Sequence, residues 1–141
     1  MGRHADQSLW DMAMGILRCL RRMPLWVQIW MALVLIPTNL GGLFFLGEPY
    51  AAVILILANV AMLIVAVMIV AQNGTSKIMS APHVVCRVAL LALLAALLSG
   101  GIDASAGYVS YLWVLMAVNA LALGFDSYAT WCWLCGDREI V

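Results

Sequence analysis

Four cysteines and one histidine are the side chains of this sequence best suited to chemistry. Cys132 and Cys135 are separated by two residues, the spacing of a redox pair or of half a metal site, and on a helix the two side chains share a face. Cys19, Cys86 and His83 fall near the same predicted membrane depth, so the five residues together contain enough ligands for a tetrahedral zinc shell. The second Cys-x-x-Cys pair of a strong zinc signature is missing, and unliganded cysteine behaves as a small hydrophobic residue in apolar helices. We therefore expect inert thiols and no cofactor, with a metal or redox site as the alternative.

Charged and polar residues in or next to the apolar segments form a second candidate site. Arg87 lies about one turn inside the third apolar segment, Asp126 closes the fourth, and Gln28 lies one turn into the first. All three are predicted to project near the same depth. An ionisable group within a membrane span is costly and is expected to have a partner, although Arg87 is also placed to extend its side chain to the interface. We expect an Arg87–Asp126 ion pair with a structural role, and a gate is the alternative.

Asparagines form a third group of polar residues in the apolar segments. Counted from the outer ends, Asn39 and Asn59 lie about seven and eight residues deep, which places them at similar levels. Buried amides at matching depth form interhelical hydrogen bonds that contribute about 0.6–2 kcal/mol. We expect Asn39, Asn59 and Asn119 to make structural polar contacts.

Four apolar segments position these side chains, at residues 25–46, 51–71, 82–98 and 106–125. Each is about 17–22 residues long, which suffices to cross a hydrocarbon core of about 30 Å at 1.5 Å per helical residue. All 7 Lys and Arg residues lie before the first segment, around the second connection or after the fourth segment, and none lies in the first or third connection. The positive-inside rule then places both termini in the cytoplasm. The sequence predicts an all-α membrane protein with a four-transmembrane-helix bundle in the inner (plasma) membrane.

The bundle domain is expected over residues 25–135, between an amphipathic segment at 1–24 and a short cytoplasmic tail at 136–141. Apolar residues recur at helical spacing within the 1–24 segment, which predicts a short interfacial helix. Its expected membrane-surface anchors are Trp10, Arg18, Arg21 and Arg22.

Proline, glycine and aromatic residues refine this topology. Pro37 and Gly41 predict a kink in the outer half of the first span. Tyr108 and Tyr111 fall near the outer interface, where we expect them to join the aromatic belt. At the other interface, residues 131–135 are expected to extend the fourth helix beyond its apolar segment.

Composition and absent motifs exclude several function classes. Hydrophobic residues make up 66% of the chain and charged residues 10%, which is typical of a membrane protein rather than a soluble or nucleic-acid-binding one. The first span lacks the carboxylate of small proton-coupled multidrug transporters. The outer connections lack the cysteine pairs of quinone-linked thiol oxidases, and His4 and His83 do not fit bis-histidine haem ligation. With no HExxH sequence and no Gly-rich phosphate loop, we do not expect an enzyme.

Three sequence features resemble small bacterial four-helix inner-membrane proteins of unassigned function. They are the Trp-rich entry at residues 25–30, the stretch from Asn39 to Phe45, and the ending Asn119…Asp126…Gly136-Asp137-Arg138. The resemblance implies location and fold, and it carries no functional residues.

The expected function is that of a non-catalytic accessory or assembly subunit of a larger membrane complex. Its expected partners are the lipid bilayer and other membrane subunits or further copies of itself. The alternatives are a small homo-oligomeric channel or transporter, favoured by the irregular first span, and a cytoplasm-facing metal or thiol sensor that uses Cys132 and Cys135.

Overall fold

The computed structural model of the 141-residue chain describes residues 10, 11, 13, 14, 17, 18, 21, 24–72 and 76–138. Within this part of the chain the fold is all-helical. Four helical spans are long and apolar enough to cross a membrane, namely Leu25–Phe45, Ala51–Gln72, Lys77–Ser99 and Ala106–Leu134. The predicted all-α class is confirmed, and so is the presence of four helices long and apolar enough to cross a membrane.

The spans differ in regularity. The first is composite and consists of α2 (Leu25–Trp30), the π-helical turn η1 (Met31–Leu35), α3 (Ile36–Leu40) and the 3-10 helix η2 (Gly41–Phe45). The others are α4 (Ala51–Gln72), the 3-10 turn η3 (Lys77–Met79) with α5 (Ser80–Ser99), and α6 (Ala106–Leu134).

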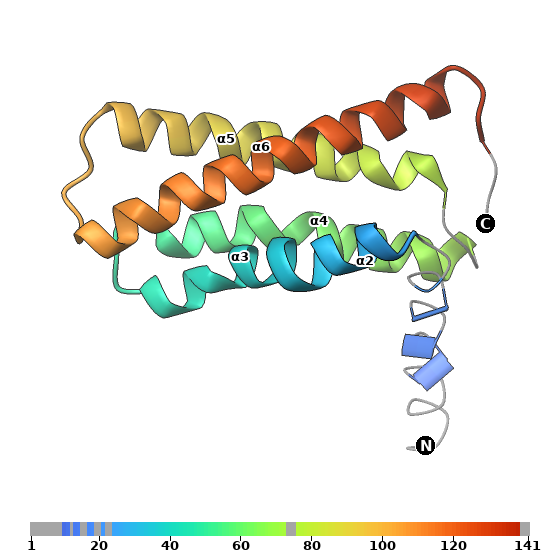
Figure 1. Ribbon diagram of the computed structural model, residues 1–141, viewed down its shortest axis with the longest axis horizontal. Coiled ribbons are helices and arrows are strands. Elements are labelled where there is room, and N and C mark those ends of the chain that lie inside the picture. The colour runs from blue at the N-terminus through green and yellow to red at the C-terminus, as the bar shows by residue number, and fades with distance from the viewer. Residues whose placement is uncertain are drawn as a thin grey trace.

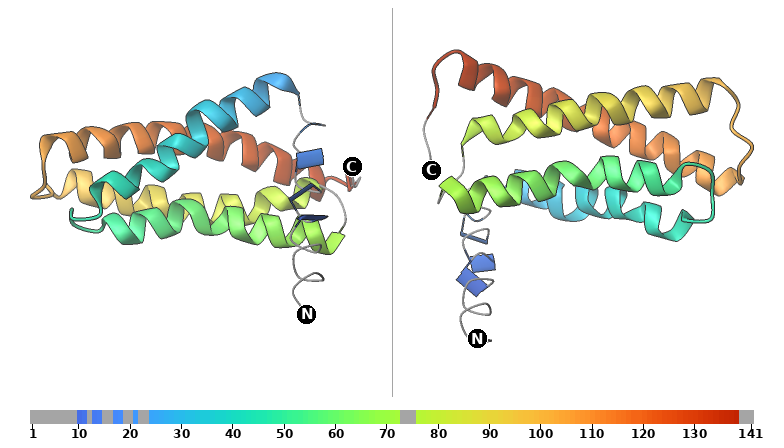
Figure 2. Two further views of the ribbon diagram at one scale, coloured as in Figure 1. Left: turned by 90° about the horizontal axis from the view of Figure 1, so that it is seen from below. Right: turned by 180° about the vertical axis from the view of Figure 1, so that it is seen from behind.

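The four spans form an antiparallel bundle with two distinct ends (Figure 1). We call the end with residues 46–50 and 100–105 the loop end, and the end where α2 begins and α6 finishes the terminal end. α5 packs against both α4 and α6. The first span packs against α6, and it reaches α4 through α3 and η2 near the loop end. From below, α2 is seen to diverge from α4 toward the terminal end (Figure 2).

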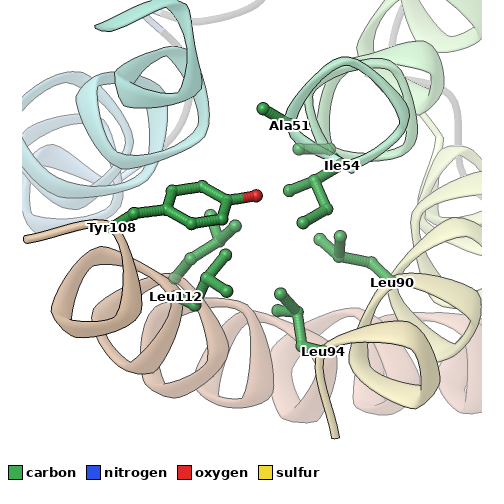
Figure 3. Close-up of a cluster of buried hydrophobic side chains, with 8 residues drawn as sticks. Ala51, Ile54, Leu90, Leu94, Tyr108 and Leu112 are labelled. Carbon is green, nitrogen blue, oxygen red and sulfur yellow. The ribbon is translucent and has the colours of Figure 1, made fainter. Parts of the chain in front are cut away.

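The hydrophobic core lies in the loop half of the bundle. Side chains from α4, α5 and α6 converge there (Figure 3), and the buried cluster comprises Ala51, Ile54, Ala58, Leu90, Leu94, Tyr108, Leu112 and Leu115. In α4 the buried residues are spaced three or four apart and three of the four are alanines. Small residues on one stripe let helix backbones approach closely in a membrane.

Two spans are longer at the terminal end than their apolar segments. The third begins at Lys77 rather than at residue 82, and α6 ends at Leu134 rather than at 125. α6 ends where Gly136 adopts φ 110°, and the Gly136 and Asp137 amides donate to the carbonyls of Trp133 and Cys132, each at 3.1 Å. This is a Schellman cap, and it agrees with the predicted helical extension over 131–135.

The predicted kink in the first span is a change of helix type. Pro37 lacks an N–H and crowds the carbonyl four residues before it, which the wider π turn immediately upstream accommodates. On the other side, the backbone tightens into η2. A Cβ added to Gly41 would lie 2.9 Å from Cε2 of Tyr111, so glycine permits the close approach of η2 to α6.

The described residues of the 1–24 segment are mostly helical and exposed. Trp10, Arg18 and Arg21 are helical and exposed, and Arg18 Nε donates to the Met14 carbonyl at 3.4 Å. The predicted anchor Arg22 lies outside the described residues.

Candidate functional site: an intramembrane polar network

One polar network links all four spans inside the bundle. Its centre is Asn119 on α6, whose Nδ2 donates to Asn39 Oδ1 at 2.9 Å and to the Leu115 carbonyl at 2.9 Å. Asn119 Oδ1 accepts from Nε of Arg87 on α5 at 3.4 Å. The side chain of Arg87 also forms an ion pair with Asp126 through Nη1 and Oδ2. Asn39, Arg87 and Asn119 are the buried polar side chains of the described part of the chain.

The second span joins this network through a side chain and a carbonyl. Asn39 Nδ2 donates to the Ala58 carbonyl of α4 at 3.5 Å. In return, Asn59 Nδ2 donates to the Asn39 carbonyl at 3.3 Å and to the Leu55 carbonyl of its own helix at 2.8 Å. The predicted contact between Asn39 and Asn59 is therefore present, and it runs from side chain to backbone.

Helical spacing explains why α6 can supply two members of the network. Leu112, Leu115, Asn119 and Ala122 follow one another at intervals of three or four residues and are all buried. Asp126 continues this stripe one turn further on. The stripe places an amide and a carboxylate on the face that meets α5 and the first span.

The Arg87–Asp126 pair lies deeper than predicted. An exposed ion pair between Lys77 and Asp137 marks a common level at the terminal end, with both side chains more than 40% exposed. Arg87 lies ten residues beyond Lys77 and Asp126 lies eleven before Asp137, which is about 15 Å along each helix at 1.5 Å per residue. Arg87 lies further than one turn into its helix because the third helical span begins at Lys77, before its apolar segment. At this depth the Arg87 side chain is 8% exposed and is paired within the bundle.

A second set of contacts closes the loop end. Tyr111 Oη donates to the Thr38 carbonyl at 2.7 Å, and Tyr108 Oη donates to the Pro49 carbonyl at 2.9 Å. Glu48 accepts from the hydroxyl of Ser105 at 2.6 Å, which ties the two loop-end connections together. The Ser105 hydroxyl also accepts from the Tyr108 amide at 3.3 Å and so caps α6.

The prediction that Tyr108 and Tyr111 join an aromatic belt was wrong, because their side chains pack inside the bundle rather than outside it. Tyr108 is fully buried, Tyr111 is half-buried, and both rings pack on Phe45, with centroids 5.5 and 5.1 Å away. Their positions at the end of a span are compatible with either the lipid or the core, and only the neighbouring helices decide between them. The signal in the sequence was Gly41, whose lack of a side chain makes room for an aromatic ring.

The predicted metal or redox site draws on cysteines and one histidine from several segments of the chain. The described residues contain no group of three or more His, Cys, Asp or Glu side chains placed to hold a metal ion. Cys86 and Cys132 are half-buried and Cys135 is exposed, all as free thiols, and His83 is half-buried on α5. Cys19, the fifth candidate ligand, lies outside the described residues.

Gln28, the last predicted polar contact, is half-buried on α2. Beyond it, the Trp26 ring contacts that of Phe125 on α6, with centroids 5.9 Å apart. At the end of α6, the Arg138 guanidinium lies 4.6 Å from the ring centroid of Trp133.

Comparison with known proteins gives no match to a family model, a curated protein or a solved structure.

Proposed function

We propose that this protein is a non-catalytic accessory or assembly subunit that packs against a larger membrane complex. The observation that supports this is the uneven burial of its spans. Among the described residues, α2 has no buried residue, α4 has none after Ala61, and α6 has none after Ala122. The loop half is internally packed, whereas the terminal parts of these three helices have no fully buried side chain and leave surface for neighbours.

The exposed surface of the terminal half is large and aromatic. Four aromatic side chains on α2 and α6 are more than half exposed there, namely Trp26, Phe125, Tyr128 and Trp131. Large aromatic side chains are enriched at the centres of protein interfaces. In contrast, the buried polar groups Asn39, Arg87 and Asn119 bond to one another and so brace the bundle.

The test is a native mass spectrum of the tagged chain, expressed at its natural level and extracted in the mildest effective detergent. We expect a heteromeric mass that identifies the complex. Replacing Phe125, Tyr128 and Trp131 with leucine would keep the surface apolar, and we expect it to reduce the heteromeric fraction. A lone monomer or a homo-oligomer as the sole species would refute the proposal.

We further propose that the protein lies in the inner (plasma) membrane with both termini in the cytoplasm. The support is the distribution of Lys and Arg, all of which lie outside the two loop-end connections. Reporter fusions that are active only on one side of the membrane test this at the C-terminus and, as a control, within residues 100–105. The same signal at both positions would contradict it.

A small homo-oligomeric channel or transporter is the second candidate function. It is favoured by the irregular first span, which contributes Asn39 to a network that also contains an intramembrane ion pair. Irregular helices at membrane depth line the binding sites of many transporters. Ion or solute flux in liposomes that contain only the purified chain would favour this candidate over the first.

A further inference from the structure

The first span has one half that is firmly held in the bundle. Toward the loop end, the Asn39 side chain bonds to Asn119 and to the Ala58 carbonyl, and the Asn39 carbonyl accepts from Asn59. The Thr38 carbonyl accepts from Tyr111. These bonds fix α3 to both α4 and α6.

The other half, Leu25–Leu35, packs against α6. We call it the terminal arm. Its residues Trp30, Met31 and Val34 pack around a small cluster made by Leu35, Val118 and Ala122. Closer to its start, the Trp26 ring meets that of Phe125. Leu35 is the single buried residue of the terminal arm, and near the terminal end the arm diverges from α4 (Figure 2).

The terminal arm lies over the part of α6 that carries Asp126. The arm and α6 are antiparallel. Leu35, at one end of the arm, therefore packs near Val118, and Trp26, at the other end, meets Phe125 further along α6. Asp126 is the next residue, and its side chain is 20% exposed although it pairs with Arg87. One turn on, Thr130 Oγ1 is buried with no hydrogen-bond partner.

The junction between the two halves has the features of a hinge. The π turn η1 occupies Met31–Leu35, and Pro37, which removes a backbone donor, follows at once. Kinks and π turns locally weaken the regular hydrogen-bond ladder, and π turns often occur at functional sites.

From these contacts we propose that the terminal arm pivots about residues 31–37 while α3 and η2 stay fixed, and that this motion uncovers the Arg87–Asp126 pair from the side of the bundle. In the structure the arm packs on Val118, Ala122 and Phe125, beside Asp126 on α6. When it moves away, Asp126 becomes more accessible from within the membrane.

Distances between spin labels in nanodiscs test the motion. In a background with all four cysteines replaced by alanine, one pair of labels is placed at the exposed residues Ile29 and Tyr128, across the terminal arm and α6. A matched pair at Phe44 and Trp113, both exposed near the loop end, joins the same two spans across their fixed half. We expect a second, longer distance population for the first pair and a single narrow one for the matched pair. We also expect Pro37→Ala to reduce the longer population, because it restores a backbone donor at the junction.

A chemical measurement checks that the motion exposes Asp126. A bis-maleimide crosslinker that joins Trp26→Cys to Phe125→Cys, in the same background, would hold the arm at α6. We expect the crosslink to lower the labelling of Asp126 by a hydrophobic carbodiimide several-fold relative to the uncrosslinked form, as read by peptide mass spectrometry. Equal labelling in both forms, or a label distribution at Ile29 and Tyr128 as narrow as that of the matched pair, would overturn the proposal. Neither readout depends on a partner subunit, so each can fail independently of the proposed function.

Discussion

The contact between Asn39 and Asn119 provides a quantitative test of the polar network. Asn119→Ala removes the donor to Asn39 Oδ1 and the acceptor of Arg87 Nε, both at buried side chains. An interhelical hydrogen bond in a membrane protein contributes about 0.6 kcal/mol on average and up to about 1.7. A buried polar group left without a partner costs about 1–3 kcal/mol. We therefore expect Asn119→Ala to lower the free energy of unfolding by about 2–4 kcal/mol.

A double-mutant cycle separates the amide contact from the other effects of each substitution. Combining Asn39→Ala with Asn119→Ala should give a coupling energy of about 0.6–1.7 kcal/mol, because both side chains share one hydrogen bond. Asn59→Ala is the matched control. Asn59 bonds to the carbonyls of Asn39 and Leu55 rather than to Asn119, so its coupling with Asn119 should stay below about 0.5 kcal/mol.

The assay is reversible unfolding in mixed micelles with increasing sodium dodecyl sulfate, followed by far-UV circular dichroism and by the fluorescence of the six tryptophans. If the two cycles give equal coupling energies, the Asn39–Asn119 bond is not a stabilising contact and the reasoning fails.

The remaining predictions concern charge and packing. Asp126→Asn should reduce the yield of folded protein and lower its melting temperature, because it leaves Arg87 buried without a counter-charge. The double variant Arg87→Met, Asp126→Leu should recover part of the loss. A normal melting temperature in Asp126→Asn would contradict the stabilising role of the pair. Lys77→Ala breaks an exposed ion pair and should leave the melting temperature unchanged, so a clear decrease would show that the pair matters more than its exposure indicates. Gly41→Ala should cost about 1–3 kcal/mol by overpacking against α6, whereas Gly124→Ala adds a methyl group in open space and should be nearly neutral; similar unfolding midpoints for the two variants would refute the close packing of η2.

Sequence patterns predicted the spans well because long apolar runs have few alternatives in a membrane. The same patterns placed Arg87 too close to the start of its helix, since hydropathy locates apolar residues and helices continue past them. Lys77 and Trp131 both lie in helical turns beyond the apolar segments, where helix propensity and capping decide the boundary. The cap at Gly136 was visible in the sequence, and it marks the end of α6 better than hydropathy does.

Individual polar contacts were partly predictable from depth. Asn39 and Asn59 were paired by counting residues from the outer ends, and the structure brings them within hydrogen-bond distance. The central position of Asn119 could not be read in this way, because depth does not reveal which face of a helix meets which neighbour. That information depends on the bundle order and on the rotation of α6 about its own axis. Tyr108 illustrates the same limit, since its position near an interface fits both a lipid-facing and a buried ring.

Polar contacts and burial together divide the bundle into two halves with different properties. Lipid is as apolar as leucine, so helices in a membrane gain little from apolar contact alone and depend on close packing and hydrogen bonds for a defined arrangement. In the loop half, Asn39, Tyr108 and Tyr111 all make such bonds, and the core there is closed. In the terminal half, the Arg87–Asp126 pair crosses between α5 and α6 while α2 remains without a buried residue. A helix that is hydrogen-bonded to both neighbours at one end and diverges from α4 at the other can change its neighbours without unfolding the bundle. The terminal half is therefore where binding of a subunit and movement of the first span would affect each other, and a partner that packs on α2 would favour one position of the arm.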